Sequence, residues 1–260
     1  MQNGLGVERD LYDALKKING SEEPRIISTA VWIGTRMLNK NTVEHNEFDR
    51  VSMGVYRPDS TTVTNTTAET ALLTEFADIL KAGGSDVIVV PEIQRIKYSK
   101  NLWNCVFGTT AAISRCALPT VFRSPHMDPG SSNSEPLPST TTTSVDDGRS
   151  PSQLATAEVP SRTSIIKENT IPFIYDALTE MYTLGLKLFP ASEAGPGLDP
   201  DIVSNTLKTT AALHTRTDST HRPSMLVDVE MGRPMELDVV VGEVVRMGRK
   251  MEVQMPVCDI

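Results

Sequence analysis

Cysteines, long apolar runs and clustered basic residues are scarce in this sequence, and each shortage excludes a class of protein. The chain has 3 cysteines, Cys105, Cys116 and Cys258, which stand in no metal-ligand spacing. Disulfide-rich secreted domains carry more cysteines, usually in even numbers, so the count favours a reducing compartment. No apolar run approaches the ~18–20 residues that a membrane-spanning helix needs.

The charge balance excludes a further class. A net charge of −8 argues against a general nucleic-acid binder, because phosphate backbones are held by clustered lysine and arginine side chains. The N-terminal residues form neither an apolar signal core nor an arginine-rich transit pattern. We therefore expect a cytoplasmic protein, with the mitochondrion as the alternative, and neither a nucleic-acid nor a membrane partner.

The first 91 residues have the pattern of an α/β domain. Residues 8–18 carry apolar side chains at helical spacing, and Thr66 followed by Glu69 is a capping-box pattern that predicts a second helix. Short β-branched or alternating segments predict strands at residues 26–33, 42–45, 51–55 and 87–90. We expect the first three strands, with a turn at residues 46–49, to form a small antiparallel meander, and the fourth to be buried.

From residue 92 the apolar spacing is helical. It predicts one long, largely buried helix through residues 96–113 and further helices at residues 174–188, 202–213, 224–230 and 236–250. Residues 124–163 are dominated by Ser, Thr, Pro and Asp, and have too little to bury to offset ~1–2 kcal/mol of ordering entropy per residue. We interpret them as a disordered insertion in a helical domain of residues 92–260.

Four side chains are candidates for chemistry, although each alone has a simpler explanation. Lys100 and Asn104 are four residues apart and share one helix face, where they could act as proton donor and hydroxyl anchor, or lie at the surface and bond locally. Glu236 and Ser224 begin predicted helices, where acidic residues and serines are common for structural reasons. The 4 histidines are scattered, and no metal site is expected.

The combination of these residues is more specific than any one of them. Residues 224–238, with a Gly-Arg-Pro break followed by Glu-Leu-Asp, closely resemble the signature of the ketopantoate reductase C-terminal domain. Lys100 and Asn104 are similar to the Lys-x-x-x-Asn helix motif of that family, and Asn3-Gly4 is similar to its Asn-Gly loop. The following strands, around residues 32–36, resemble a fungal variant.

The resemblance implies a fold, a cofactor and a reaction. Residues 1–91 would be a remnant of a Rossmann-type nucleotide-binding domain. Residues 92–260 would form an all-α domain like the C-terminal domain of 6-phosphogluconate dehydrogenase. Members of the family reduce the ketone of 2-dehydropantoate to pantoate with NADPH, in pantothenate and coenzyme A biosynthesis. We therefore expect a 2-keto acid as the small-molecule partner, and a homodimer is a further possibility.

The resemblance also assigns roles to five residues. Lys100 would be the general acid, and Glu236 would bind substrate or hold Lys100 in place. Ser224 would bind the substrate carboxylate and Asn104 its hydroxyl group, while Asn3 would lie at the domain cleft in contact with the cofactor.

The sequence departs from the family pattern in three places. Gly108 and His221 stand where substrate-contacting asparagines are common, which allows an altered 2-keto acid preference. The G-x-G-x-x-G turn that holds the pyrophosphate of a dinucleotide does not occur. One hypothesis is therefore a fragment or truncated paralogue that cannot bind NADPH with normal affinity. The alternatives are a non-catalytic helical binding or dimerisation module, or a related 3-hydroxyacid dehydrogenase, which should not carry the motif at residues 224–238.

Overall fold

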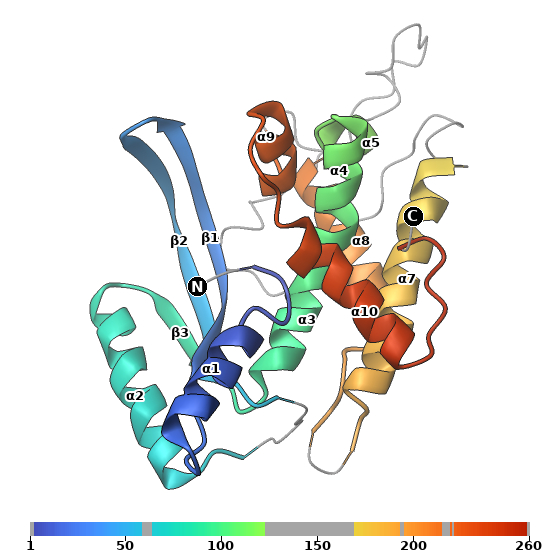
Figure 1. Ribbon diagram of the computed structural model, residues 1–260. Coiled ribbons are helices and arrows are strands. Elements are labelled where there is room, and N and C mark those ends of the chain that lie inside the picture. The colour runs from blue at the N-terminus through green and yellow to red at the C-terminus, as the bar shows by residue number, and fades with distance from the viewer. Residues whose placement is uncertain are drawn as a thin grey trace, which may run out of the picture.

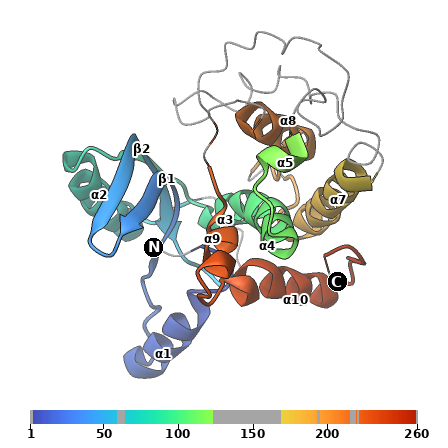
Figure 2. The ribbon, with the colours of Figure 1, turned by 90° about the horizontal axis from the view of Figure 1, so that it is seen from above.

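The computed structural model consists of a three-stranded sheet with its flanking helices, and a larger group of helices packed beside the sheet (Figure 1). It describes residues 3–58, 64–122, 169–192, 195–214, 219 and 221–258. Viewed from above, helix α2 (Thr67–Ala82) covers one side of the sheet and the helical part lies on the other side (Figure 2). The predicted fold class, α/β followed by a helical region, is confirmed.

The sheet contains two long strands in place of the three short ones that were predicted. Strands β1 (Ile27–Asn39) and β2 (Thr42–Val55) pair antiparallel, and the pairing passes from His45 to Asp49, so the predicted turn between these residues is wrong. The register of the pairing shifts between Ile33 and Thr35. Residues 46–48 of β2 lie within this irregularity, and the strand continues through them.

Strand β3 (Asp86–Val89) pairs parallel with β2, so the sheet is mixed and not a simple meander. Helix α2 (Thr67–Ala82) makes the crossover that a parallel pair requires. The prediction that this strand is buried is also wrong: it lies at the edge of the sheet, and Ile88 and Val89 are 46% and 40% exposed. The small core of this part is formed by Val51, Met53, Val55, Leu73 and Ala77.

The predicted long helix is continuous but changes its winding. Helix α3 (Ile93–Trp103) runs into a π-helical turn, η1 (Asn104–Gly108), and then into α4 (Thr109–Ser114). Its middle is buried, with Leu102 and Phe107 at 0% exposure, whereas Ile113 near its end is 81% exposed. The prediction of a largely buried helix therefore holds up to the first turn of α4 and fails at its end.

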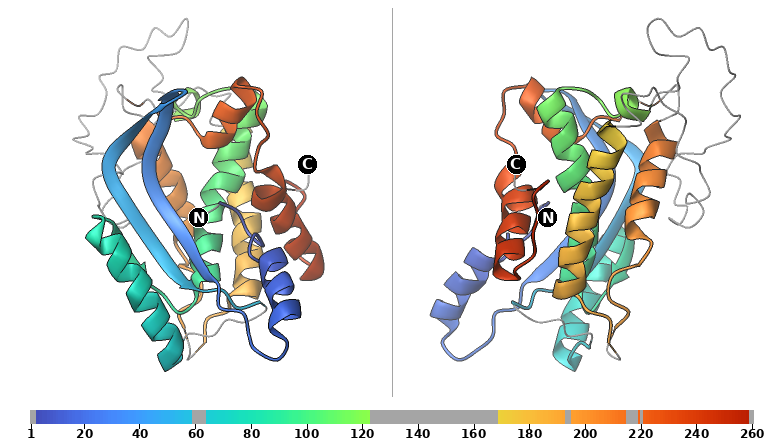
Figure 3. Two further views of the ribbon diagram at one scale, coloured as in Figure 1. Left: turned by 60° about the vertical axis from the view of Figure 1, so that its left-hand side comes forward. Right: turned by 90° about the vertical axis from the view of Figure 1, so that its right-hand side faces the viewer.

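Most of the remaining helices lie around this central one, whereas the first, α1, lies apart from it (Figure 3). They are α1 (Arg9–Asn19), α5 (Pro119–Phe122), α7 (Ile171–Leu188), α8 (Ile202–His214), α9 (Ser224–Glu230), η5 (Asp238–Gly242) and α10 (Glu243–Lys250). The predicted last helix, residues 236–250, corresponds to η5 and α10 together. The predicted insertion at residues 124–163 lies outside the described residues, and the proposed domain boundary near residue 91 stays a prediction.

The N-terminal loop connects the two parts of the molecule. Leu5 is buried in the core of the helical part, and its N–H donates to the carbonyl of Val239 at 2.8 Å. Gly4 makes this close approach with φ +82, and a Cβ atom there would lie 2.6 Å from the Val239 carbonyl oxygen. The loop is therefore held against η5, and the position of Asn3 follows from that contact.

Candidate active site

Lys100 lies in the last turn of α3 and begins a chain of hydrogen bonds across three segments. Its Nζ donates to Oδ1 of Asn3 at 2.8 Å, and Nδ2 of Asn3 donates to Oε2 of Glu236 at 3.1 Å. Asn3 comes from the N-terminal loop, and Glu236 directly precedes the last helix, where its carbonyl accepts from the N–H of Val240 at 3.0 Å. Three of the predicted residues, far apart in the sequence, are thus brought together.

The other two predicted residues line neighbouring pockets. We call the first the lysine pocket; it is lined by Asn3, Gly4, Thr29, Ala30, Lys97, Lys100, Asn101 and Asn104. We call the second the serine pocket; it is lined by Trp103, Asn104, Gly108, Pro223, Ser224, Met225, Glu236 and Val240. Asn104 lines both pockets. A hydrogen bond also links the two linings, because Asn3 of the lysine pocket donates to Glu236 of the serine pocket. All five predicted residues therefore surround one place, at the junction of the sheet and the helices.

Two π-helical turns meet at this place. Asn104 is the first residue of η1, and Glu236 lies two residues before η5, which packs against η1. A π-helical turn inserts an extra residue into the helix and so changes the direction of the side chains around it; such turns occur frequently at functional sites. The winding change after Trp103 therefore affects which side chains of the central helix line the serine pocket.

The environment of Lys100 lowers its pKa to about 8 from the usual 10.5. Burial is the main cause, because the charged ammonium loses water; Lys97 lowers the pKa further by repulsion, and the carboxylate of Glu236 opposes both effects. The Nζ also lies 5.9 Å from the centre of the Trp32 ring, on the facing strand β1. Lys100 is thus a lysine that can exchange its proton near neutral pH.

Sequence reasoning missed several residues around Lys100. Lys97 is only 5% exposed and forms an ion pair with Glu8, which also accepts from the hydroxyl of Ser28. Asn101 is 1% exposed and donates to the carbonyl of Val240 at 2.8 Å, while its Oδ1 is buried without a hydrogen-bond partner in the described part of the chain. The spacing of Lys97 three residues before Lys100 was a usable signal, because both side chains then share a helix face.

Gly108 and His221, the two positions where the family commonly has asparagine, are placed differently. Gly108 lines the serine pocket, so the missing side chain leaves space there. His221 does not belong to that lining; its ring packs edge-on against Trp103, with the ring centres 5.6 Å apart. Only the first departure therefore alters the wall of the pocket directly.

Cofactor and metal chemistry can be assessed from the residues that are described. The lysine pocket offers amide groups at Asn3 and Asn101, including an unpaired buried acceptor, and these suit a carboxamide such as that of nicotinamide. No group of three His, Cys, Asp or Glu side chains in the described ranges is arranged to hold a metal ion. Within the same ranges, none of the helices is both long and apolar enough to cross a membrane.

Comparison with known proteins relates part of the sequence to a described family. Residues 158–260 match the family described as ketopantoate reductase PanE/ApbA C terminal. No curated protein has a sequence that matches this chain.

Solved structures extend the likeness to the whole chain at the level of the fold. The 2-dehydropantoate 2-reductase of Methylococcus capsulatus is 19% identical, with a TM-score of 0.63 over 99% of this chain and 60% of its own. A D-mandelate dehydrogenase bound to NADH and anilino(oxo)acetate is 18% identical, with a TM-score of 0.59 over 99% of this chain and 62% of its own.

A dimeric ketopantoate reductase of Staphylococcus aureus is 14% identical, with a TM-score of 0.57 over 99% of this chain and 63% of its own. The chain thus spans less than two thirds of the length of these solved relatives. The family and these neighbours are oxidoreductases. Residues 158–260 are similar to the C-terminal domain of the ketopantoate reductases, and the described part of the chain has the fold of the corresponding part of these solved structures.

Proposed function

We propose that this chain is the substrate-handling part of a reductase that converts a 2-keto acid to the 2-hydroxy acid with NADPH. The reaction of the family, 2-dehydropantoate to pantoate in pantothenate and coenzyme A biosynthesis, is the first to test. One observation carries the proposal: a lysine, two asparagine amides, a serine hydroxyl and a carboxylate, from segments far apart in the sequence, line two adjoining pockets.

The proton donor in this proposal is Lys100. When bound, NADPH supplies the hydride that adds to the ketone carbon. The negative charge that develops on the carbonyl oxygen is stabilised by the ammonium group, which then donates its proton and leaves a neutral amine. A pKa of about 8 suits this role, because the group is largely protonated at pH 7 and releases the proton readily. The carboxylate of Glu236 favours the charged form and so restores the donor.

The remaining side chains orient the substrate. The hydroxyl of Ser224 donates to the substrate carboxylate, and the amide of Asn104, in the wall shared by the two pockets, binds the product hydroxyl. Asn3 bridges Lys100 and Glu236 and would contact the cofactor from the N-terminal loop. Hydrogen bonds to both ends of the 2-keto acid would fix the carbonyl carbon next to the lysine.

A second candidate function is a non-catalytic helical binding or dimerisation module. The observation that favours it is the dimeric state named for the S. aureus relative, which makes a homodimer a reasonable proposal under either function. We propose the cytoplasm as the location, with the mitochondrion as the alternative.

The test measures NADPH oxidation with 2-dehydropantoate by absorbance, together with NADPH binding by calorimetry. NADPH is supplied in large excess to offset a weakened affinity for the cofactor. Under that condition we expect turnover, and Lys100→Ala should reduce kcat by at least about 100-fold because the general acid is lost. Lys17→Ala, which changes an exposed lysine of α1, is the matched control and should behave as the wild type. If the chain binds NADPH but turns over no 2-keto acid, the reductase proposal is wrong; if it binds no NADPH, the binding module is favoured.

A further inference from the structure

Lys97 and Glu8 form a buried ion pair that the proposed function does not use. Nζ of Lys97 donates to Oε1 of Glu8, and the hydroxyl of Ser28 donates to the same oxygen. The three residues come from different segments, because Glu8 directly precedes α1, Ser28 lies in β1 and Lys97 lies in α3. All three side chains are buried. The ammonium group of Lys97 therefore has a fixed position inside the molecule.

Stability alone is a weak reason for such a pair. Two charges that leave water lose hydration energy, and apolar residues of similar volume often replace a buried ion pair without loss of stability. The compensation is also incomplete here, because Oε2 of Glu8 is buried and has no hydrogen-bond partner in the part of the chain that the structure describes. The pair is therefore a candidate for a role in the site beside it.

The pair presents its positive end to the lysine pocket. Lys97 belongs to the lining of this pocket together with Lys100, whereas Glu8 does not. Lys97 and Lys100 are three residues apart in α3, a spacing that places two side chains on one helix face. Charges interact more strongly where little water surrounds them. Lys100 is therefore repelled by the ammonium of Lys97 more than it is attracted by the carboxylate of Glu8.

We propose that Lys97, held in place by Glu8, is a positioning residue whose fixed positive charge keeps Lys100 ready to give up its proton. This inference rests on the proposed function and adds a residue that acts through the amine of Lys100. In the reduction, the N–H bond of the Lys100 ammonium breaks and an O–H bond forms at the alkoxide oxygen of the product. Lys100 then becomes a neutral amine, so the repulsion between the two lysines is relieved as the proton leaves.

Other groups around Lys100 remain when the ion pair is removed. Glu236, which precedes η5, attracts the ammonium, and burial disfavours its charge. Trp32 of β1 lies on the facing side, with its ring centre 5.9 Å from Nζ of Lys100 and 4.9 Å from Cζ of Arg50 in β2. Removal of the pair alone should therefore raise the pKa of Lys100 above its value of about 8, because only the repulsion by Lys97 is lost.

The test replaces the pair without leaving either partner alone. Glu8→Gln combined with Lys97→Met keeps similar shapes and an acceptor for Ser28, whereas Lys97→Arg keeps the positive charge and the ion pair. The pKa of Lys100 is measured in the full chain by NMR titration of lysine labelled at Cε, with the signal assigned from Lys100→Arg. We expect the double variant to titrate higher than wild type by about half a pH unit or more, and Lys97→Arg to titrate like the wild type.

The pH profile of kcat/KM for 2-keto acid reduction, with NADPH in excess, is the second readout. We expect its alkaline limb to move to higher pH in the double variant and to stay in place in Lys97→Arg, because the limb follows the loss of the proton from Lys100. A pair with a merely structural role would lower kcat/KM or the free energy of unfolding without moving the limb.

A matched control and separate outcomes make the test decisive. Lys17→Met combined with Glu22→Gln makes the same exchange at exposed positions and should move neither readout. An unchanged pKa of Lys100 in the double variant, or an equal rise in Lys97→Arg, overturns the inference whatever the activity. Absence of turnover in the wild type overturns the proposed function instead, and the NMR titration then still decides whether Lys97 acts on Lys100.

Discussion

The surroundings of Lys100 shift the pKa of its amine in opposite directions. The resulting pKa of about 8 suits a group that donates a proton near neutral pH. Burial and the nearby Lys97 favour the neutral amine, whereas Glu236 favours the ammonium. The hydrogen bond to Asn3 fixes where the proton points. A lysine left at its ordinary pKa would hold its proton too tightly for transfer at neutral pH. The same burial that serves the chemistry should therefore cost stability.

That cost is testable through the pH dependence of Lys100→Met. The pKa is about 8 in the folded state and near 10.5 in the unfolded chain, so between these values the unfolded state binds more protons and stability rises with pH. Below pH 8 the buried charge costs on the order of 1–3 kcal/mol, allowing for partial exposure. We expect Lys100→Met to be more stable than wild type at pH 7 by urea denaturation, with the difference shrinking as pH rises through this window.

The control for this experiment is Lys17→Met, which removes an exposed lysine of α1 and should follow the wild-type curve. Parallel curves for wild type and Lys100→Met across the same pH range would contradict the burial of the ammonium group. The result does not depend on the substrate, so it separates the electrostatics of the site from the assignment of the reaction.

At the scale of residues, the sequence predicted part of the site. The four-residue spacing of Lys100 and Asn104 was enough to place them on one helix face, but their meeting with Asn3 and Glu236 was expected only from the family resemblance. Trp32 was not predicted as a neighbour of the lysine. No local pattern relates an aromatic residue of a strand to a helix that begins about 60 residues later.

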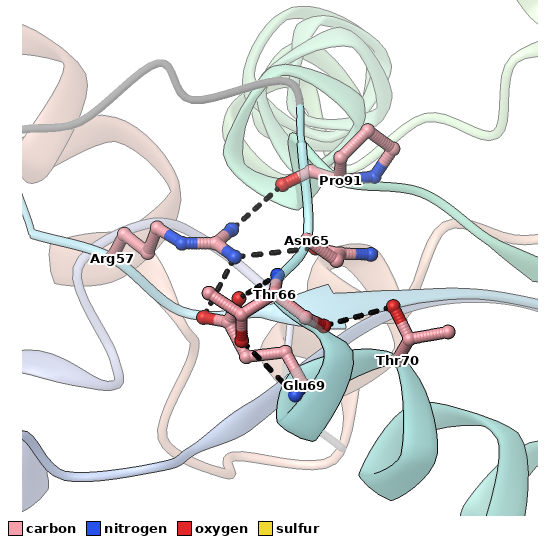
Figure 4. A network of polar contacts seen from close by, with 6 residues as sticks. All are labelled: Arg57, Asn65, Thr66, Glu69, Thr70 and Pro91. Atoms are coloured by element: carbon pink, nitrogen blue, oxygen red, sulfur yellow. Dashed lines mark hydrogen bonds and ion pairs between the residues drawn. The ribbon is translucent and has the colours of Figure 1, made fainter.

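At the scale of elements, helix α2 shows how side chains fix where a helix begins (Figure 4). Thr66 accepts from the N–H of Glu69, and the Glu69 carboxylate accepts from the N–H of Thr66, which completes the predicted capping box. Arg57 forms an ion pair with Glu69 at 2.8 Å and donates to the carbonyl of Pro91 at 3.0 Å. The start of α2 is thereby tied to the end of β2 and to the segment before α3.

Removing the cap should have a measurable effect. We expect Thr66→Ala to lower the free energy of unfolding by about 1 kcal/mol, because the N–H of Glu69 loses its acceptor. Thr74→Ala is the matched control in the same helix: Thr74 is exposed and bonds back to the carbonyl of Thr70, so its loss should be neutral or slightly stabilising. Equal losses from both substitutions in chemical denaturation would show that the capping box does not fix the helix start.

Elements with local signals were predicted well, and those set by tertiary contacts were not. The capping box marks the beginning of α2 in the sequence itself, and the spacing of the apolar residues indicates α1. Residues 46–49 were mistaken for a turn, because the pairing of two long strands overrides local preference. The π-helical turns left no sequence signal, since they depend on how the helices pack around the site.

At the scale of the whole molecule, the site lies where the sheet and the helices meet (Figure 1). Strand β1, helix α3, the N-terminal loop and the start of the last helix each contribute to it. Composition and periodicity indicated an α/β part followed by helices, and this fold class is confirmed, while the domain boundary stays a prediction. The reaction class came from the resemblance, because many unrelated functions share such a fold.

The central claim is that this arrangement carries hydride transfer to a 2-keto acid, and one measurement addresses it most directly. NADPH deuterated at the transferable position of the nicotinamide C4 is incubated with the chain and a 2-keto acid, and the 2-hydroxy acid is analysed by mass spectrometry. We predict a product with one deuterium at C2 from the wild type, and at least about 100-fold less from Lys100→Ala. A chain that binds NADPH yet forms no deuterated product would contradict the claim.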